Sequence, residues 1–311
     1  MTAVKKYLSL IKFSHTIFAM PFAMIGFFLG VLHRHLTGSL NNAIGWGTDI
    51  TNLTAWQFYG FKFLLVMLCM IFARSAAMAF NRYLDKNFDA KNPRTAIREI
   101  PAGLIKANHA LLFTIVCCVL FVVCCWFINP LCFYLSFVAL FVILFYSYTK
   151  RFTALCHLVL GLGLSLAPIG AYLAVTGVFG LLPVLFSLTV LFWVSGFDII
   201  YALQDEEFDR SNQLHSIPAA LGKAKALRVS EILHLFAAAF VVYAGVLGHF
   251  GYSYWIGVAI FIGMLFYQHS IVKPNDLRRV NLAFMTANGI ASVLFAIFAI
   301  ADLILTKKLF G

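Results

Sequence analysis

The chain has 311 residues, of which 62% are hydrophobic and only 11% are charged. Soluble globular proteins carry roughly 25% charged residues, so this composition excludes an ordinary soluble protein and indicates a membrane protein. The net charge of +11 at pH 7 invites a nucleic-acid partner. In a membrane protein we attribute it instead to cytoplasmic loops rich in Lys and Arg and to an anionic ligand, so we expect no nucleic acid.

Apolar runs of about 20 residues recur along the chain, and each can cross the ~30 Å hydrocarbon core as a helix. Helices satisfy their own backbone hydrogen bonds in lipid, which favours them here. The breaks between runs include INP (128–130), TGVFGLLP (176–183) and GHFGYS (248–253). We predict one all-α, polytopic membrane domain over residues 1–311, with about nine transmembrane helices. The predicted spans are 15–33, 57–80, 109–128, 131–148, 155–176, 180–201, 227–247, 253–272 and 283–305.

The positions of the 23 Lys and Arg residues predict the orientation of these helices. With the N-terminus in the cytoplasm, most of them fall in cytoplasmic segments, and only Arg34, Lys62, Lys307 and Lys308 fall on the other side. Such an asymmetry is typical of membrane proteins, whose cytoplasmic loops are enriched in cations. The inner ends of the second and sixth predicted helices therefore face the cytoplasm.

Most of the 12 acidic residues lie in two short windows at those inner ends. The window FNRYLDKNFDAKNPRT (80–95) places Asn81, Asp85 and Asp89 four residues apart, and GFDIIYALQDEEFDR (196–210) places Asp205 and Asp209 at the same spacing. Four-residue spacing puts side chains on one helical face. A solvated, salt-bridged loop explains one such motif, but two matched copies favour a site in which a cation lies between the carboxylates.

The expected cation is Mg²⁺, which takes oxygen ligands and usually completes its octahedron with waters and phosphate oxygens. Two carboxylate clusters with nearby cations are suited to hold Mg²⁺ and a diphosphate. The candidates for phosphate contacts are Lys91, Arg94, Lys150 and Arg151. We expect Lys86, Arg98 and Lys106 to be ordinary loop cations. No nucleotide-binding glycine loop is present in the sequence.

Two charged residues lie deeper in the predicted helices. Arg74 precedes Asn81 by seven residues and Asp198 precedes Asp205 by seven, so each lies about 10 Å further into the membrane than its motif. Ionisable groups at such depth are functional candidates. Arg74 and Asp198 either form an ion pair between helices or line a pocket below the metal site.

The stretch NRYLDKNFDAKNPRT, followed by PAG, resembles the first aspartate-rich motif of the UbiA superfamily of intramembrane prenyltransferases. DIIYALQDEEFDR resembles the second motif, YSYTKRFT (146–153) resembles the basic segment after the fourth helix, and IKFSHTIFAMPFAMIG (11–26) resembles the first helix. The resemblance is strongest to the branch similar to 4-hydroxybenzoate polyprenyltransferases, including the enzyme of the futalosine route to menaquinone. It implies a helical bundle around a central cavity open to the cytoplasm.

The resemblance also implies roles for individual residues. Asn81, Asp85, Asp89, Asp205 and Asp209 are expected to bind Mg²⁺ and, through it, the diphosphate. Lys150 and Arg151 match the family's basic pair, and Arg74 and Asp198 match charged positions common in this branch. Many members have Asp after the motif Asn, where this chain has Arg82. We expect the metal site to be retained because position 82 lies about 100° around the helix from Asn81.

The implied reaction is the transfer of a polyprenyl group from an allylic diphosphate to an aromatic acid in ubiquinone or menaquinone biosynthesis. Asp85, Asp205, Arg151 and Asp198 are the expected catalytic residues, and the face of Tyr146 could stabilise the allylic cation, with packing as its alternative role. The expected partners are the two substrates and the lipid bilayer, without an obligate protein partner, at the bacterial inner membrane. Other acceptors (naphthoate, haem, chlorophyllide) and a transporter of divalent cations or organic diphosphates remain alternatives.

Overall fold

The computed structural model describes residues 3–11, 18–37, 43–44, 48–49 and 54–306. In this part of the chain, eight helical segments are long and apolar enough to cross a membrane, which identifies an integral membrane protein. They are α3 (Ala55–Leu84), α5 (Ala107–Ile128), α6 (Pro130–Thr149), α7 (Cys156–Thr176), α8 (Leu181–Ala202), α11 (Lys223–Leu247), α12 (Tyr252–Ile271), and α13 (Asn288–Leu305) with the π-helical turn η3 (Leu282–Ala287) before it.

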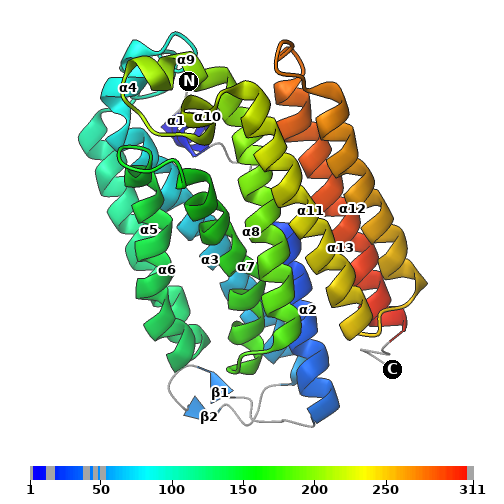
Figure 1. Ribbon diagram of the computed structural model, residues 1–311. Coiled ribbons are helices and arrows are strands. Elements are labelled where there is room, and N and C mark those ends of the chain that lie inside the picture. The colour runs from blue at the N-terminus through cyan, green and yellow to red at the C-terminus, as the bar shows by residue number, and fades with distance from the viewer. Residues whose placement is uncertain (1–2, 12–17, 38–42, 45–47, 50–53, 307–311) are drawn as a thin grey trace.

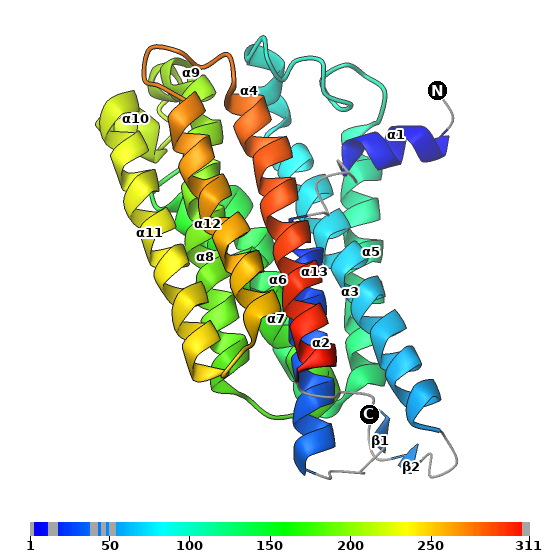
Figure 2. The ribbon, with the colours of Figure 1, turned by 90° about the vertical axis from the view of Figure 1, so that its right-hand side faces the viewer.

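The first predicted span, 15–33, corresponds to α2 (Met20–Thr37), and residues 15–17 lie outside the described residues. The last turn of α2 carries Arg34 and His35, and α2 is not one of the eight segments. It nevertheless lies among them, packed against α7 and α13. Figures 1 and 2 show these nine long helices running side by side as one bundle. The predicted all-α membrane fold is therefore confirmed.

The helix ends follow local sequence signals. Thr54 starts α3 with a capping box, in which its side chain and that of Gln57 exchange hydrogen bonds with backbone amides. Asn129 separates α5 from α6: its Oδ1 accepts from Cys132 N at 2.7 Å, and Pro130 occupies the first turn, where no amide hydrogen is needed. Gly177 ends α7 with a φ of 71°. The INP and TG breaks thus end helices as predicted.

Close helix contacts depend on small residues, as is usual in lipid. A side chain at Gly26 of α2 would overlap the carbonyl of Pro168 in α7. The core beyond this contact is aromatic: the Phe22 ring lies 5.5 Å from Trp193 and 5.6 Å from Phe295, measured between ring centroids. This packing joins α2, α7, α8 and α13, and α6 lies on the far side of α7 (Figure 1).

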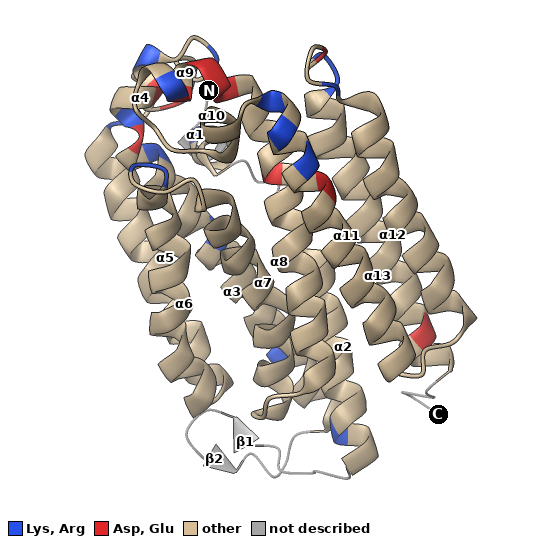
Figure 3. Cartoon of the chain, viewed as in Figure 1, with Lys and Arg blue, Asp and Glu red and all other residues tan. Residues whose placement is uncertain are grey.

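Short elements gather at the two ends of the bundle. At one end lie α1 (Ala3–Leu10), α4 (Lys86–Lys91), the 3₁₀ turn η2 (Leu203–Asp205), α9 (Glu206–Ser211) and α10 (Ile217–Leu221). At the other end, β1 (Ala43–Ile44) pairs antiparallel with β2 (Thr48–Asp49). Most charged side chains of the described residues gather at the end with α4 and α9 (Figure 3). The two acidic motifs therefore lie at the same end of the bundle.

Candidate active site

The first acidic motif lies where α3 ends. Asp85 is both the C-cap of α3 and the N-cap of α4. Backbone bonds from Asp85 N to Asn81 O (2.9 Å) and from Asp89 N to Asp85 O (2.7 Å) preserve the four-residue spacing across this junction. Asn81 Nδ2 donates to Asp85 Oδ2 at 3.0 Å, and Arg151, which follows α6, lies 3.6 Å from Asp85 Oδ1. The basic segment thus contacts the first motif.

Asp89 is buried and paired with two arginines from its own part of the chain. Arg98 Nη1 donates to Asp89 Oδ1 at 2.6 Å, so the prediction of an ordinary loop cation at position 98 is wrong. Arg82 is also buried, and its Nη1 lies 3.9 Å from Asp89 Oδ2. The angle between positions 81 and 82 around α3 gave no indication of this contact between Arg82 and Asp89. Asp89 lies on a separate helix, α4, which begins after the break at Asp85.

The second motif begins with Asp205, in the 3₁₀ turn after α8. Arg94 binds its buried carboxylate with two nitrogens: Nε donates to Oδ1 at 3.0 Å and Nη2 contacts Oδ2. Asn92 Nδ2 also donates to Asp205 Oδ1 at 3.0 Å, and Arg94 Nη1 donates to the hydroxyl of Tyr201 at 2.9 Å. The loop after the first motif therefore crosses to the second. Lys91 is exposed and forms no ion pair with the described residues, so its phosphate contact stays a prediction.

Asp209, in α9, is fully buried. The ammonium of Lys150 lies 2.7 Å from its Oδ1, and Ser216 Oγ donates to its Oδ2 at 2.8 Å. Lys150 and Arg151 are neighbours in sequence, yet one contacts the second motif and the other contacts the first. In the described structure, each of the four motif aspartates is thus paired with a Lys or Arg side chain.

Burial and neighbouring charges shift the pKa values of the charged groups in the two motifs and their partners. Burial and the neighbouring charge of Asp89 raise the pKa of Asp85 to about 6. Burial by itself lowers the pKa of Lys150, but the charge of Asp209 outweighs it and raises the pKa overall. The pKa of Arg94 is raised in the same way: burial lowers it, but the hydrogen bonds and charge of Asp205 outweigh burial. The cations therefore remain charged at neutral pH, whereas Asp85 is a carboxylate that a bound cation would stabilise strongly.

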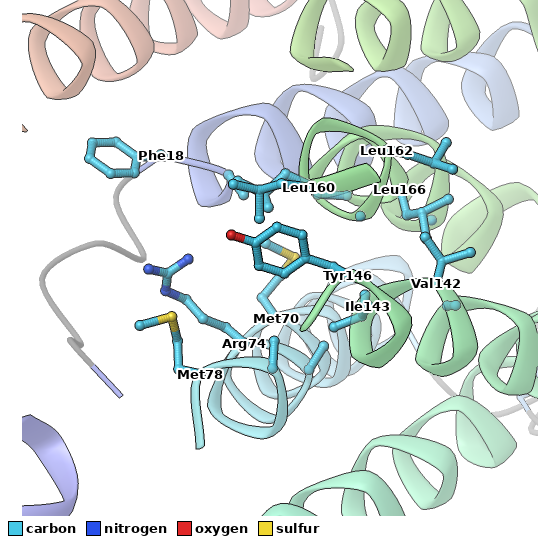
Figure 4. Close-up of a pocket in the computed structure, with 18 of the residues that line it drawn as sticks. Phe18, Met70, Arg74, Met78, Val142, Ile143, Tyr146, Leu160, Leu162 and Leu166 are labelled. Carbon is cyan, nitrogen blue, oxygen red and sulfur yellow. The ribbon is translucent and has the colours of Figure 1, made fainter. Parts of the chain in front are cut away.

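Below the motifs lies a cavity of about 910 Å³, near the upper end of the range for small-molecule sites. Its polar lining residues include Arg74, Asn81, Tyr146 and Asp198, and apolar side chains of α3, α5, α6 and α7 line the rest. Figure 4 shows the Arg74 guanidinium and the Tyr146 ring projecting into the same space, with Met70 beside them. Both deep charges therefore line the cavity, as predicted.

The alternative prediction, an ion pair between Arg74 and Asp198, is wrong for the described residues. Asp198 Oδ2 lies 2.7 Å from Nδ1 of His157, a buried side chain on α7. Arg74 Nε has no hydrogen-bond partner among the described residues. His157 was not predictable from the sequence, because a single histidine without a second ligand at a helical spacing gives no signal. Asn92 was missed too, although it lies within the first window.

The oxygen donors of the motifs fit Mg²⁺ in kind, since carboxylates and amides are hard ligands. Asp89 Oδ2 is buried without a hydrogen-bond partner in the described part of the chain, a cost that a bound cation would relieve. Among the described residues, no three Asp, Glu, His or Cys side chains converge on one point. Mg²⁺ commonly binds proteins through one or two carboxylates, with waters and substrate phosphates as its other ligands.

Solved structures share this architecture. A UbiA homologue from Aeropyrum pernix K1 superposes with a TM-score of 0.73 and 26% identity, covering 94% of this chain and 98% of that one. A UbiA homologue from Archaeoglobus fulgidus, bound to DMAPP and Mg²⁺, has a TM-score of 0.71 and covers 96% of this chain and 99% of that one. Its 20% identity establishes the fold alone. The fold is that of the UbiA homologues.

Sequence comparison makes the assignment specific. Residues 45–290 match the UbiA prenyltransferase family. A 4-hydroxybenzoate octaprenyltransferase of Tolumonas auensis is 30% identical over 237 residues, 76% of this chain and 82% of that protein. The enzyme of the same name from Nitrosospira multiformis is 31% identical over 234 residues, 75% of this chain and 80% of that protein. The chain belongs to the UbiA prenyltransferase family.

Proposed function

We propose that the protein transfers a polyprenyl group from an allylic polyprenyl diphosphate to an aromatic acid similar to 4-hydroxybenzoate, in ubiquinone or menaquinone biosynthesis. The observation that carries the proposal is the meeting of both acidic motifs and their cations above an apolar cavity. Relatives named 4-hydroxybenzoate octaprenyltransferase support this choice of acceptor.

The diphosphate binds at the mouth of the cavity. The residues that would hold Mg²⁺ there are Asn81, Asp85, Asp89, Asp205 and Asp209. When bound, Mg²⁺ neutralises the charge that develops on the leaving diphosphate. The chain's own cations supply further neutralisation: Lys91, Arg94, Lys150 and Arg151. A diphosphate oxygen can replace the aspartate that Arg94, Lys150 or Arg151 contacts in the present structure, and the exposed Lys91 adds its charge at the same mouth.

The aromatic acceptor binds deeper in the cavity than the diphosphate. Arg74 pairs with its carboxylate, and Asp198 accepts a hydrogen bond from its hydroxyl, which makes the ring more nucleophilic at the ortho carbon. The allylic C–O bond breaks and both electrons leave with the diphosphate. The ortho ring carbon then forms the new C–C bond and releases its hydrogen as a proton. The face of Tyr146 stabilises the allylic cation, and the apolar walls keep water away from it.

The prenyl tail occupies the apolar part of the cavity. Two of the apolar lining residues, Val138 on α6 and Leu162 on α7, are 57% and 40% exposed, so the wall between these helices is not closed. A long tail can leave the cavity there and continue into lipid. Such an exit explains why the reaction belongs in a membrane.

The proposed location is the bacterial inner membrane, with the site facing the cytoplasm. The concentration of Lys and Arg at the end that carries the motifs supports this orientation (Figure 3). Acceptors such as a naphthoate, a haem or a chlorophyllide are the alternatives within the same family. Family membership argues against the alternative of a transporter.

The test uses purified protein in nanodiscs with Mg²⁺, geranyl diphosphate and a panel of phenolic acids and naphthoates. Mass spectrometry identifies any prenylated acceptor. We expect a prenylated 4-hydroxybenzoate. Product with a naphthoate alone would retain the prenyl transfer and replace the acceptor, whereas absence of product with every acceptor and chain length would reject the proposal.

A further inference from the structure

A buried histidine connects the deep carboxylate to the rest of the site. His157 lies in the first turn of α7 and is buried, with its Nδ1 2.7 Å from Asp198 Oδ2. The backbone N–H of Ile217 points at the other ring nitrogen and donates to His157 Nε2 at 3.4 Å. Asp198 lines the cavity, and its side chain is 16% exposed.

These two contacts favour one tautomer of the imidazole. Because the Ile217 amide is a donor, the geometry favours Nε2 as the acceptor and the ring hydrogen on Nδ1. Nδ1 then donates to Asp198. This hydrogen bond holds the carboxylate of Asp198 in one orientation. It occupies Oδ2 and leaves Oδ1 for another donor.

We propose that His157 is a positioning residue that keeps Asp198 oriented to accept a hydrogen bond from the hydroxyl of the aromatic acceptor. This role rests on the proposed function. The residue acts through Asp198 and does not itself touch either substrate.

The chain segment that fixes His157 also contacts the diphosphate site. Ser216, directly before Ile217, donates to Asp209, and the amide of His215 donates to the carbonyl of Lys150 at 2.7 Å. One short segment thus aligns the deep carboxylate with one aspartate and one cation of the cavity mouth. The relative placement of acceptor and diphosphate therefore depends on residues 215–217.

Other titratable groups line the cavity with Asp198. Tyr146 from α6 and Arg74 from α3 line the same cavity, and Cys156 lies beside His157 on α7. Towards the mouth, the next charged groups near Tyr146 are Asp85 and Arg98. His234 of α11 contacts Gly196, about 200° around α8 from Asp198.

The test compares His157→Leu, His157→Asn and Asp198→Asn with the wild type in steady-state turnover. The Asn amide nitrogen can take the place of imidazole Nδ1 and donate to Asp198, whereas Leu cannot. We expect His157→Leu to lower kcat/KM for the acceptor by about 10- to 100-fold, as loss of an orienting partner commonly does. His157→Asn should recover most of that loss, and KM for the prenyl diphosphate should stay within about twofold because the diphosphate binds elsewhere.

Rescue by His157→Asn, together with a loss confined to the acceptor, separates positioning from mere packing. A packing defect would affect both substrates, and the smaller Asn side chain would not repair it. In a double variant with Asp198→Asn, the two losses should not add. His109→Leu, an exposed position at the start of α5, is the control and should match the wild type.

The outcomes are separable. An equally low rate in His157→Leu and His157→Asn would overturn the positioning role and leave the proposed function intact. Wild-type turnover by His157→Leu would do the same. Absence of turnover in the wild type itself would reject the proposed function, and the role of His157 with it. A melting temperature for each variant identifies loss of folding, and His157→Asn keeps the test valid if His157→Leu does not fold.

Discussion

Asp85→Asn should remove activity with little effect on folding. The side chains of Asp85 and Arg151 are 26% and 37% exposed and lie 3.6 Å apart, so their ion pair contributes no more than about 1 kcal/mol. The Asn oxygen can still accept the hydrogen bond from Asn81. Asp205→Asn is a poorer test, because it removes charge-assisted hydrogen bonds to a buried carboxylate, each with a net contribution of about 1.5–3 kcal/mol.

Asp85→Asn should lower turnover far more than it lowers stability. Loss of a partner one shell away from a metal costs about 10- to 100-fold, so loss of a direct ligand should lower kcat/KM at least about 100-fold, or about 2.7 kcal/mol. The assay measures diphosphate release with Mg²⁺, geranyl diphosphate and 4-hydroxybenzoate, alongside a melting curve. Asp276→Asn, in an exposed loop, is the matched control. Turnover by Asp85→Asn within about threefold of the wild type would refute the assignment of Asp85 as a metal ligand.

Three further predictions concern the tail, the cations and pH. Gly170→Phe fills open space in the cavity, so it should reduce turnover of long-chain diphosphates more than turnover of geranyl diphosphate. Gly263→Phe is the control: its new side chain also meets open space, but outside the cavity, so neither turnover should change. Arg94→Ala should raise KM for the prenyl diphosphate about tenfold or more, whereas Lys91→Ala, at an exposed position, should change it less. Below about pH 6, protons should compete with Mg²⁺ for Asp85 and weaken Mg²⁺ binding by up to about tenfold per pH unit. Above that pH, the affinity for Mg²⁺ should be constant. Titrations of Mg²⁺-dependent diphosphate binding at a series of pH values measure both regimes.

The membrane made much of the fold predictable. Lipid requires helices of about 20 apolar residues, so each long helix appears in the sequence as one such run. The errors fall at the ends, where polar residues continue a helix beyond its apolar run. The span predicted at 57–80 is α3, which extends to Leu84 and so includes Asn81 and Arg82. Likewise, α11 begins at Lys223 rather than at the predicted residue 227.

The residues of the two motifs were predictable, but their partners were not. Arg94 and Asp205 are 111 positions apart, and only the packing of the loop against η2 brings them together. Arg98 had the same sequence context as other loop cations and was misjudged. His157 lies on an apolar helix with no pattern around it, and its contact with Asp198 depends on how α7 packs against α8.

The central claim is that the protein couples diphosphate release to prenylation of an aromatic acid. The most direct measurement follows both products in one reaction of wild-type protein, geranyl diphosphate and 4-hydroxybenzoate, with Mg²⁺ or with EDTA. We predict one prenylated acid for each diphosphate released with Mg²⁺, and neither product with EDTA. Absence of diphosphate release with Mg²⁺ at any prenyl chain length would contradict the account.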